Sequence, residues 1–188
     1  MASLWGSILG LWIRIGTRLF PPVIHPMMVH FPIVLLWGSF LISVLALVWR
    51  THDRFLDRAS FWLAVLGLIA GTVTAATGVL SEQFVKWNAT TSALLQTHQT
   101  YAILTGMFTV LLVLSRLVAR YPRTQFDRQW SLFGTGRGRS TLLSLIFGLG
   151  AVVMVTMTAS IGGTMVYQYG TGVHGVAFHT PHFGPRHP

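Results

Sequence analysis

Histidine is the residue in this chain whose number and placement point to metal or haem chemistry. The chain has eight histidines and no cysteine, so imidazole nitrogens are the ligands that remain for a metal ion or a haem iron. Four of them lie at the ends of apolar segments: His25, His30, His98 and His174. Because an ionisable side chain at membrane depth costs free energy, each is a candidate functional residue.

Other kinds of site lack the residues they need. Without cysteine there is no disulfide, thiolate zinc site, iron–sulfur cluster or covalently attached c-type haem. Three of the four carboxylates, Asp53, Asp57 and Asp127, lie among arginines, and there is no paired-carboxylate site, Ser/His/Asp arrangement or phosphate loop. The sequence leaves enzyme activity open and favours a non-catalytic subunit of an oxidoreductase complex.

The composition is that of a membrane protein. Hydrophobic residues make up 52% of the chain and charged residues only 9%, against about 25% charged in a typical soluble domain. The net charge of +9 does not indicate nucleic-acid binding, because the arginines flank apolar segments and form no single basic face.

The apolar residues fall into four stretches, at about 28–49, 59–80, 101–118 and 142–167. Each is close to the ~20 residues that cross a bilayer core as a helix. We predict an all-α membrane protein whose residues 25–169 form a bundle of four transmembrane helices. Residues 1–24 have an amphipathic pattern and predict a helix along the membrane surface, while residues 170–188 predict an extended tail rich in glycine, proline and histidine.

The basic residues predict an orientation. Four spans place both termini on one side, and the opposite side carries nine of the thirteen basic residues: Arg50, Arg54, Arg58, Arg116, Arg120, Arg123, Arg128, Arg137 and Arg139. The positive-inside rule places that side in the cytoplasm. Both termini and the four candidate histidines are then expected on the extracytoplasmic side, which is the periplasmic side of a bacterial inner (plasma) membrane.

The spacing suggests a haem pair. Gly38 follows His30, and Gly106 follows His98, each on the same helical face, where a glycine leaves room beside an imidazole. Two histidines from different helices of a bundle can hold a b-type haem. We take His30 and His98 as the axial pair. His25 and His174 come next, as ligands of a second haem or as supporting groups. The basic residues available for the haem propionates are Arg18 and Lys86.

Two segments have the form of sequence motifs: residues 25–33, His-Pro-Met-Met-Val-His-Phe-Pro-Ile, and residues 162–173, Gly-Gly-Thr-Met-Val-Tyr-Gln-Tyr-Gly-Thr-Gly-Val. They resemble the opening and the closing motif of a bacterial membrane family, the domain of unknown function 2231. His98 stands where the family tends to carry a histidine. The resemblance covers about residues 25–174 and implies a four-helix membrane domain suspected of haem binding or of association with redox proteins.

The leading hypothesis is a membrane subunit of a respiratory-type electron-transfer complex. It would bind b-type haem near the extracytoplasmic face and relay electrons between the quinone pool and a partner subunit. One alternative is a haem-free accessory or scaffold subunit that stabilises a larger membrane complex. Another is a metal-binding or transport protein that uses the same histidines and Met27 or Met28, although the spans contain no charged pathway of the kind that ion transport needs.

Overall fold

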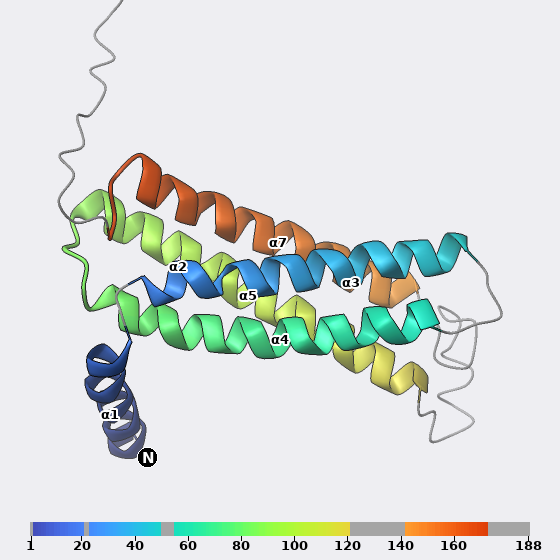
Figure 1. Ribbon diagram of the computed structural model, residues 1–188, viewed down its shortest axis with the longest axis horizontal. Coiled ribbons are helices and arrows are strands. Elements are labelled where there is room, and N and C mark those ends of the chain that lie inside the picture. The colour runs from blue at the N-terminus through green and yellow to red at the C-terminus, as the bar shows by residue number, and fades with distance from the viewer. Residues whose placement is uncertain (1, 21–22, 50–54, 121–141, 173–188) are drawn as a thin grey trace, which may run out of the picture.

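The structure is a computed structural model that describes residues 2–20, 23–49, 55–120 and 142–172, and within these ranges the regular secondary structure is all α-helix, with turns and loops between the helices (Figure 1). The helices are α1 (Ala2–Leu19), α2 (Ile24–Met28), α3 (His30–Val48), α4 (Phe55–Glu82), α5 (Ala89–Arg120) and α7 (Leu142–Tyr167). The prediction of an all-α fold is confirmed.

Four segments are long and apolar enough to cross a membrane. They are Ile24–Val48, which joins α2 and α3, then Phe55–Glu82, Ala89–Ala119 and Leu142–Tyr167. Their mean hydropathies lie between 2.0 and 2.4. The four predicted spans are therefore confirmed, and the chain is a multi-pass membrane protein.

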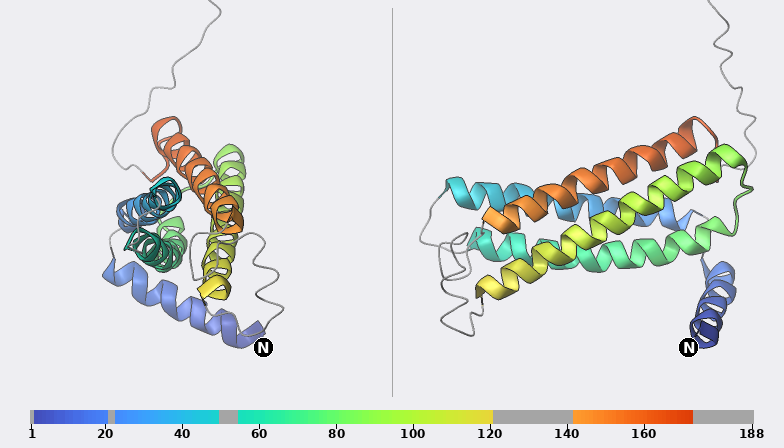
Figure 2. Two further views of the ribbon diagram at one scale, coloured as in Figure 1. Left: turned by 90° about the vertical axis from the view of Figure 1, so that its right-hand side faces the viewer. Right: turned by 180° about the vertical axis from the view of Figure 1, so that it is seen from behind.

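The spans form two antiparallel hairpins. α3 packs along α4, and α5 packs along α7, and these are the two most extensive helix contacts (Figure 2). α3 and α5 run in the same direction, while α4 and α7 return. We call the end at which α2 and α5 begin, with His25 and His98, the histidine end. The opposite end, with Arg116, is the arginine end.

Small residues let the helices of each hairpin approach closely. Ala64 and Ala151 are each 1% exposed, and a Cβ added at Gly67 would lie 2.9 Å from Leu36 Cδ2. Large apolar side chains such as Val34 and Ile103 are instead exposed on the outside of the bundle. Small residues inside the bundle and large apolar residues outside it suit a membrane protein. Close packing of small residues holds such helices together, while the large apolar groups contact lipid.

The third span begins earlier than the sequence suggested. The polar residues after Leu80 predicted a loop to about residue 100, but α5 already starts at Ala89. Asn88 caps the helix: its Oδ1 accepts a hydrogen bond from the Thr91 N–H at 2.9 Å, and Thr91 Oγ1 accepts one from the Asn88 N–H at 3.0 Å. His98 therefore lies inside a helix, two to three turns from its start, and not at the beginning of one.

Helix α1 is not one of the four spans; it lies crosswise to the bundle at the histidine end and contacts α4 there (Figure 1). The Trp12 Nε1–H donates to the Ala76 carbonyl at 3.2 Å, and Gly16 lies against the Leu80 side chain. Most of its apolar side chains remain exposed, among them Trp5 and Leu19. The predicted helix is thus present, and an exposed apolar surface of this kind suits its predicted place at the membrane surface.

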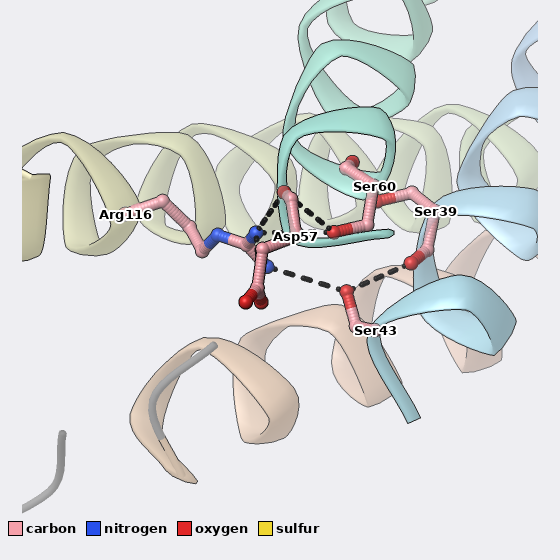
Figure 3. A network of polar contacts seen from close by, with 5 residues as sticks. All are labelled: Ser39, Ser43, Asp57, Ser60 and Arg116. Atoms are coloured by element: carbon pink, nitrogen blue, oxygen red, sulfur yellow. Dashed lines mark hydrogen bonds and ion pairs between the residues drawn. The ribbon is translucent and has the colours of Figure 1, made fainter. Parts of the chain in front are cut away.

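The arginine end is closed by a polar network centred on Arg116 (Figure 3). The side chain of Arg116 is 4% exposed, and its Nη2 donates to the Asp57 carbonyl at 2.6 Å and to Ser60 Oγ at 3.0 Å. Its Nη1 donates to Ser43 Oγ at 3.3 Å, and the Asp57 carboxylate lies 3.9 Å from Nη2. Ser39 continues the network by donating to the Ser60 carbonyl at 2.7 Å. One side chain from α5 thereby links both helices of the other hairpin.

Candidate histidine site

His25 is held in place by the neighbouring helix of its own hairpin. It lies in α2, and its Nδ1 is 3.0 Å from the Thr74 carbonyl oxygen of α4. A carbonyl can only accept a hydrogen bond, so Nδ1 carries the proton and donates. In the neutral ring Nε2 is then unprotonated and free to act as a ligand.

His98 repeats this arrangement in the second hairpin. It lies in α5, and its Nδ1 is 2.9 Å from the Thr158 carbonyl oxygen of α7. The same argument makes Nδ1 the donor and leaves Nε2 unprotonated. Metal-bound histidines commonly carry this type of hydrogen bond, which fixes the tautomer and the ring orientation.

The two rings meet where the hairpins meet. Their centroids are 6.3 Å apart, and the ring planes are inclined by 78°. Within the part of the chain that the structure describes, no hydrogen bond involves either Nε2. Two imidazoles with free Nε2 atoms, one from each hairpin, therefore form the candidate site.

A glycine makes room for each ring. A Cβ added at Gly78 would lie 3.2 Å from His25 Cε1, and one added at Gly162 would lie 3.3 Å from His98 Cε1. These glycines belong to the facing helices α4 and α7. The glycines named from the sequence, Gly38 and Gly106, do not face these two rings: a Cβ added at Gly38 would lie 3.7 Å from Leu63 Cδ1, and one added at Gly106 would meet no atom within 4 Å.

The remaining predicted residues occupy different positions. His30 begins α3 with an exposed side chain, so the ring that meets His98 is that of His25, and not that of His30 as the predicted axial pair required. Arg18, in the last turn of α1, and Lys86, between α4 and α5, are exposed in segments at the histidine end. His174 lies outside the described residues.

The family of predicted membrane proteins named DUF2231 matches residues 21–175 of the chain. The chain belongs to this family. No curated protein and no solved structure matches it. The matched range of this DUF2231 protein holds all four spans and both histidines of the site, whereas α1 lies before it. Since the family is described only as a predicted membrane protein, a function must be argued from the site itself.

The residues that hold the two rings were missed by the sequence analysis. They are the carbonyls of Thr74 and Thr158 and the glycines Gly78 and Gly162, each glycine four positions after its threonine. A signal for them exists in the sequence. Residues 72–78, Thr-Val-Thr-Ala-Ala-Thr-Gly, and residues 156–162, Thr-Met-Thr-Ala-Ser-Ile-Gly, share the pattern Thr-x-Thr-Ala-x-x-Gly.

Proposed function

We propose that this DUF2231 protein is an electron-transfer subunit of a membrane complex, and that His25 and His98 are the axial ligands of one b-type haem. The proposal rests on one observation. Two imidazoles from separate hairpins lie together, each with Nδ1 bound to a helix carbonyl and with Nε2 free.

The spacing of the rings suits a shared metal centre. An imidazole nitrogen binds a metal ion at about 2.0–2.1 Å, so two rings on opposite sides of one metal have centroids roughly 6 Å apart. The observed separation of 6.3 Å agrees with this value. The large angle between the ring planes does not interfere, because the two axial positions of an iron do not require parallel rings.

The number of ligands favours haem over a bare metal ion. The described residues contain no group of three or more His, Asp or Glu side chains that could hold a metal ion. A structural zinc site takes four protein ligands, and a catalytic one takes three. A porphyrin supplies four nitrogens of its own, so two histidines complete the coordination of its iron.

When bound, the haem would supply one-electron transfer, and the protein would set its conditions. The hydrogen bonds to the Thr74 and Thr158 carbonyls would fix the orientation of both imidazoles and increase their basicity as ligands. Arg18 and Lys86, at the same end of the bundle, are the basic groups proposed for the propionates. The predicted positive-inside orientation would make the histidine end extracytoplasmic, and the site would relay electrons there between the quinone pool and a partner subunit.

A reduced-minus-oxidised absorption spectrum of the full chain, with pyridine haemochrome analysis, tests the proposal. We expect a b-type spectrum in the wild type and its loss in His25→Ala and in His98→Ala. His30→Ala is the matched control, because His30 lies five positions from His25 and is exposed. It should keep the spectrum.

A protein without porphyrin absorbance, isolated alone and with its complex, would refute the proposal. The alternative is then a haem-free scaffold subunit, for which the same contact has a structural meaning. Two aromatic rings packed edge to face at 4.5–7 Å are themselves mildly stabilising, so the histidine pair would join the hairpins without a ligand.

A further inference from the structure

The two hairpins carry the same pattern of special residues at matching positions. His25 stands in α2, which continues into α3 as one membrane span, and His98 stands in α5. Each ring lies against the second helix of its hairpin, α4 or α7. The second helices share the pattern Thr-x-Thr-Ala-x-x-Gly, whose second threonine accepts the histidine hydrogen bond and whose glycine contacts the ring. We call each such threonine carbonyl with its glycine a histidine seat: Thr74 with Gly78, and Thr158 with Gly162.

Burial follows the same register along the helices. When α3 is aligned on α5 so that the two histidines match, Leu36, Ser39 and Ser43 fall on Thr109, Leu112 and Arg116, and all six are buried. When α4 is aligned on α7 so that the two seats match, the buried residues Ser60, Ala64 and Gly67 fall on Ser144, Gly148 and Ala151, which are buried as well. The hairpins are therefore repeats of one structural unit.

The contacts between the hairpins show how the repeats are related. In a two-fold arrangement, residues near the axis contact their own equivalents. His25 contacts His98, and Ser43 accepts a hydrogen bond from Arg116, its equivalent 73 positions later. Because both hairpins run in the same direction, the axis lies along the bundle, as in parallel repeats of membrane transporters. Because His25 contacts its own equivalent His98, the histidine pair lies close to this axis.

We propose that Gly78 and Gly162 are paired positioning residues, which hold the two imidazoles in equivalent orientations so that one ligand on the pseudo-two-fold axis is bound by both Nε2 atoms. This inference rests on the proposed function and deepens it. A ligand of this kind presents two equivalent open positions on opposite sides of one metal, as haem iron does. A glycine has no side chain that could bind a ligand, so each seat would affect the ligand only by positioning its histidine ring.

Alanine at either glycine tests the role of the seat in the apoprotein. At 3.2–3.3 Å, the new Cβ would crowd the nearest ring atom and force the ring to move by tenths of an ångström. Gly71→Ala and Gly163→Ala are the matched controls, since the nearest atom is 4.0 Å away at Gly71 and none lies within 4 Å at Gly163. The readout is the ¹⁵N spectrum of labelled histidine in the full chain, where protonated and bare ring nitrogens have well-separated shifts.

We expect the wild type to show a protonated Nδ1 and a bare Nε2 on both His25 and His98. Gly78→Ala should disturb the signals of His25 most, Gly162→Ala those of His98 most, and neither control should change either ring. Unchanged ring signals in both variants would overturn the proposal, whether or not haem binds.

Haem titration of the same variants gives the second readout. Each seat variant should weaken haem binding by about 10- to 100-fold, as the loss of a partner that orients a metal ligand does, and the two factors should be similar. A large effect at one glycine with none at the other would refute the equivalence of the seats. Absence of haem binding in the wild type would count against the proposed function alone, because the ¹⁵N spectra test the seats without a ligand.

Discussion

Replacing Arg116 with lysine tests whether the arginine end is held by a charge pair or by the shape of the guanidinium group. The hydrogen bonds of Arg116 include those of 2.6 Å to the Asp57 carbonyl, 3.0 Å to Ser60 Oγ and 3.3 Å to Ser43 Oγ. The Asp57 carboxylate is farther away, at 3.9 Å, and its side chain is 13% exposed. Lysine keeps the charge but lacks the planar fork that reaches several acceptors at once.

The magnitudes separate the two explanations. Side-chain hydrogen bonds in membrane proteins contribute about 0.6 kcal/mol on average and up to about 1.7 kcal/mol, so the three together contribute roughly 2–5 kcal/mol. Arg116→Leu should lose at least this amount. Arg116→Lys should lose about half of it, since one ammonium group replaces two donor nitrogens. Asp57→Asn keeps the backbone carbonyl that accepts the 2.6 Å hydrogen bond, and since the carboxylate lies 3.9 Å from Nη2, we expect this change to cost less than Arg116→Lys.

Equilibrium unfolding in bicelles, by steric trapping, measures these free energies in the full chain. We expect the order of destabilisation to be Arg116→Leu, then Arg116→Lys, then Asp57→Asn. Wild-type stability in Arg116→Lys together with a loss of several kcal/mol in Asp57→Asn would refute the reasoning, because it would show that charge and not hydrogen-bond geometry carries the contact.

Three further predictions concern packing, capping and topology. Gly150→Ala should destabilise the protein by about 1–3 kcal/mol in the same unfolding assay, because the new Cβ would lie 2.6 Å from the ring of Phe108. Wild-type stability in this variant would show that the Phe108 ring can move away at little cost. Asn88→Ala should cost about 1 kcal/mol and speed hydrogen exchange in the first turn of α5, and unchanged exchange there would contradict the capping role. In this cysteine-free chain, Lys86→Cys should react with an impermeant maleimide in intact cells and Arg58→Cys only after lysis, while the reverse pattern would invert the orientation.

The four spans could be predicted because a long apolar stretch is a property of the local sequence. Their ends could not, since a membrane helix can continue into water once its backbone is capped. α5 has 32 residues, or about 48 Å at ~1.5 Å per residue, and exceeds the ~30 Å hydrocarbon core. Its polar first turns looked like a loop, although Asn88 and Thr91 cap a helix there.

The sequence predicted a site formed by a pair of histidines, but it did not predict which two histidine rings contact each other. Histidine abundance and the absence of cysteine identified imidazole as the available ligand, and His98 was named correctly as one member of the pair that the structure brings together. Which ring meets it depends on packing between helices. His30 begins the long helix α3 on its exposed side, while His25, five positions earlier in α2, points toward α4 and bonds to Thr74.

The contact between Ser43 and Arg116 gives the joined hairpins a property that two separate copies of one hairpin would lack. Two identical chains about an exact two-fold axis would place like residues together at every axial position. Two histidines can share a ligand, but two arginines at the other end would repel each other in a buried place. In the fused chain one position is serine and the other arginine, and the hydroxyl accepts the guanidinium N–H at 3.3 Å. Covalent linkage thus permits like residues to meet at the histidine end and unlike residues to meet at the arginine end of a single bundle, so substitutions at the arginine end can differ between the halves while the two histidines stay in contact.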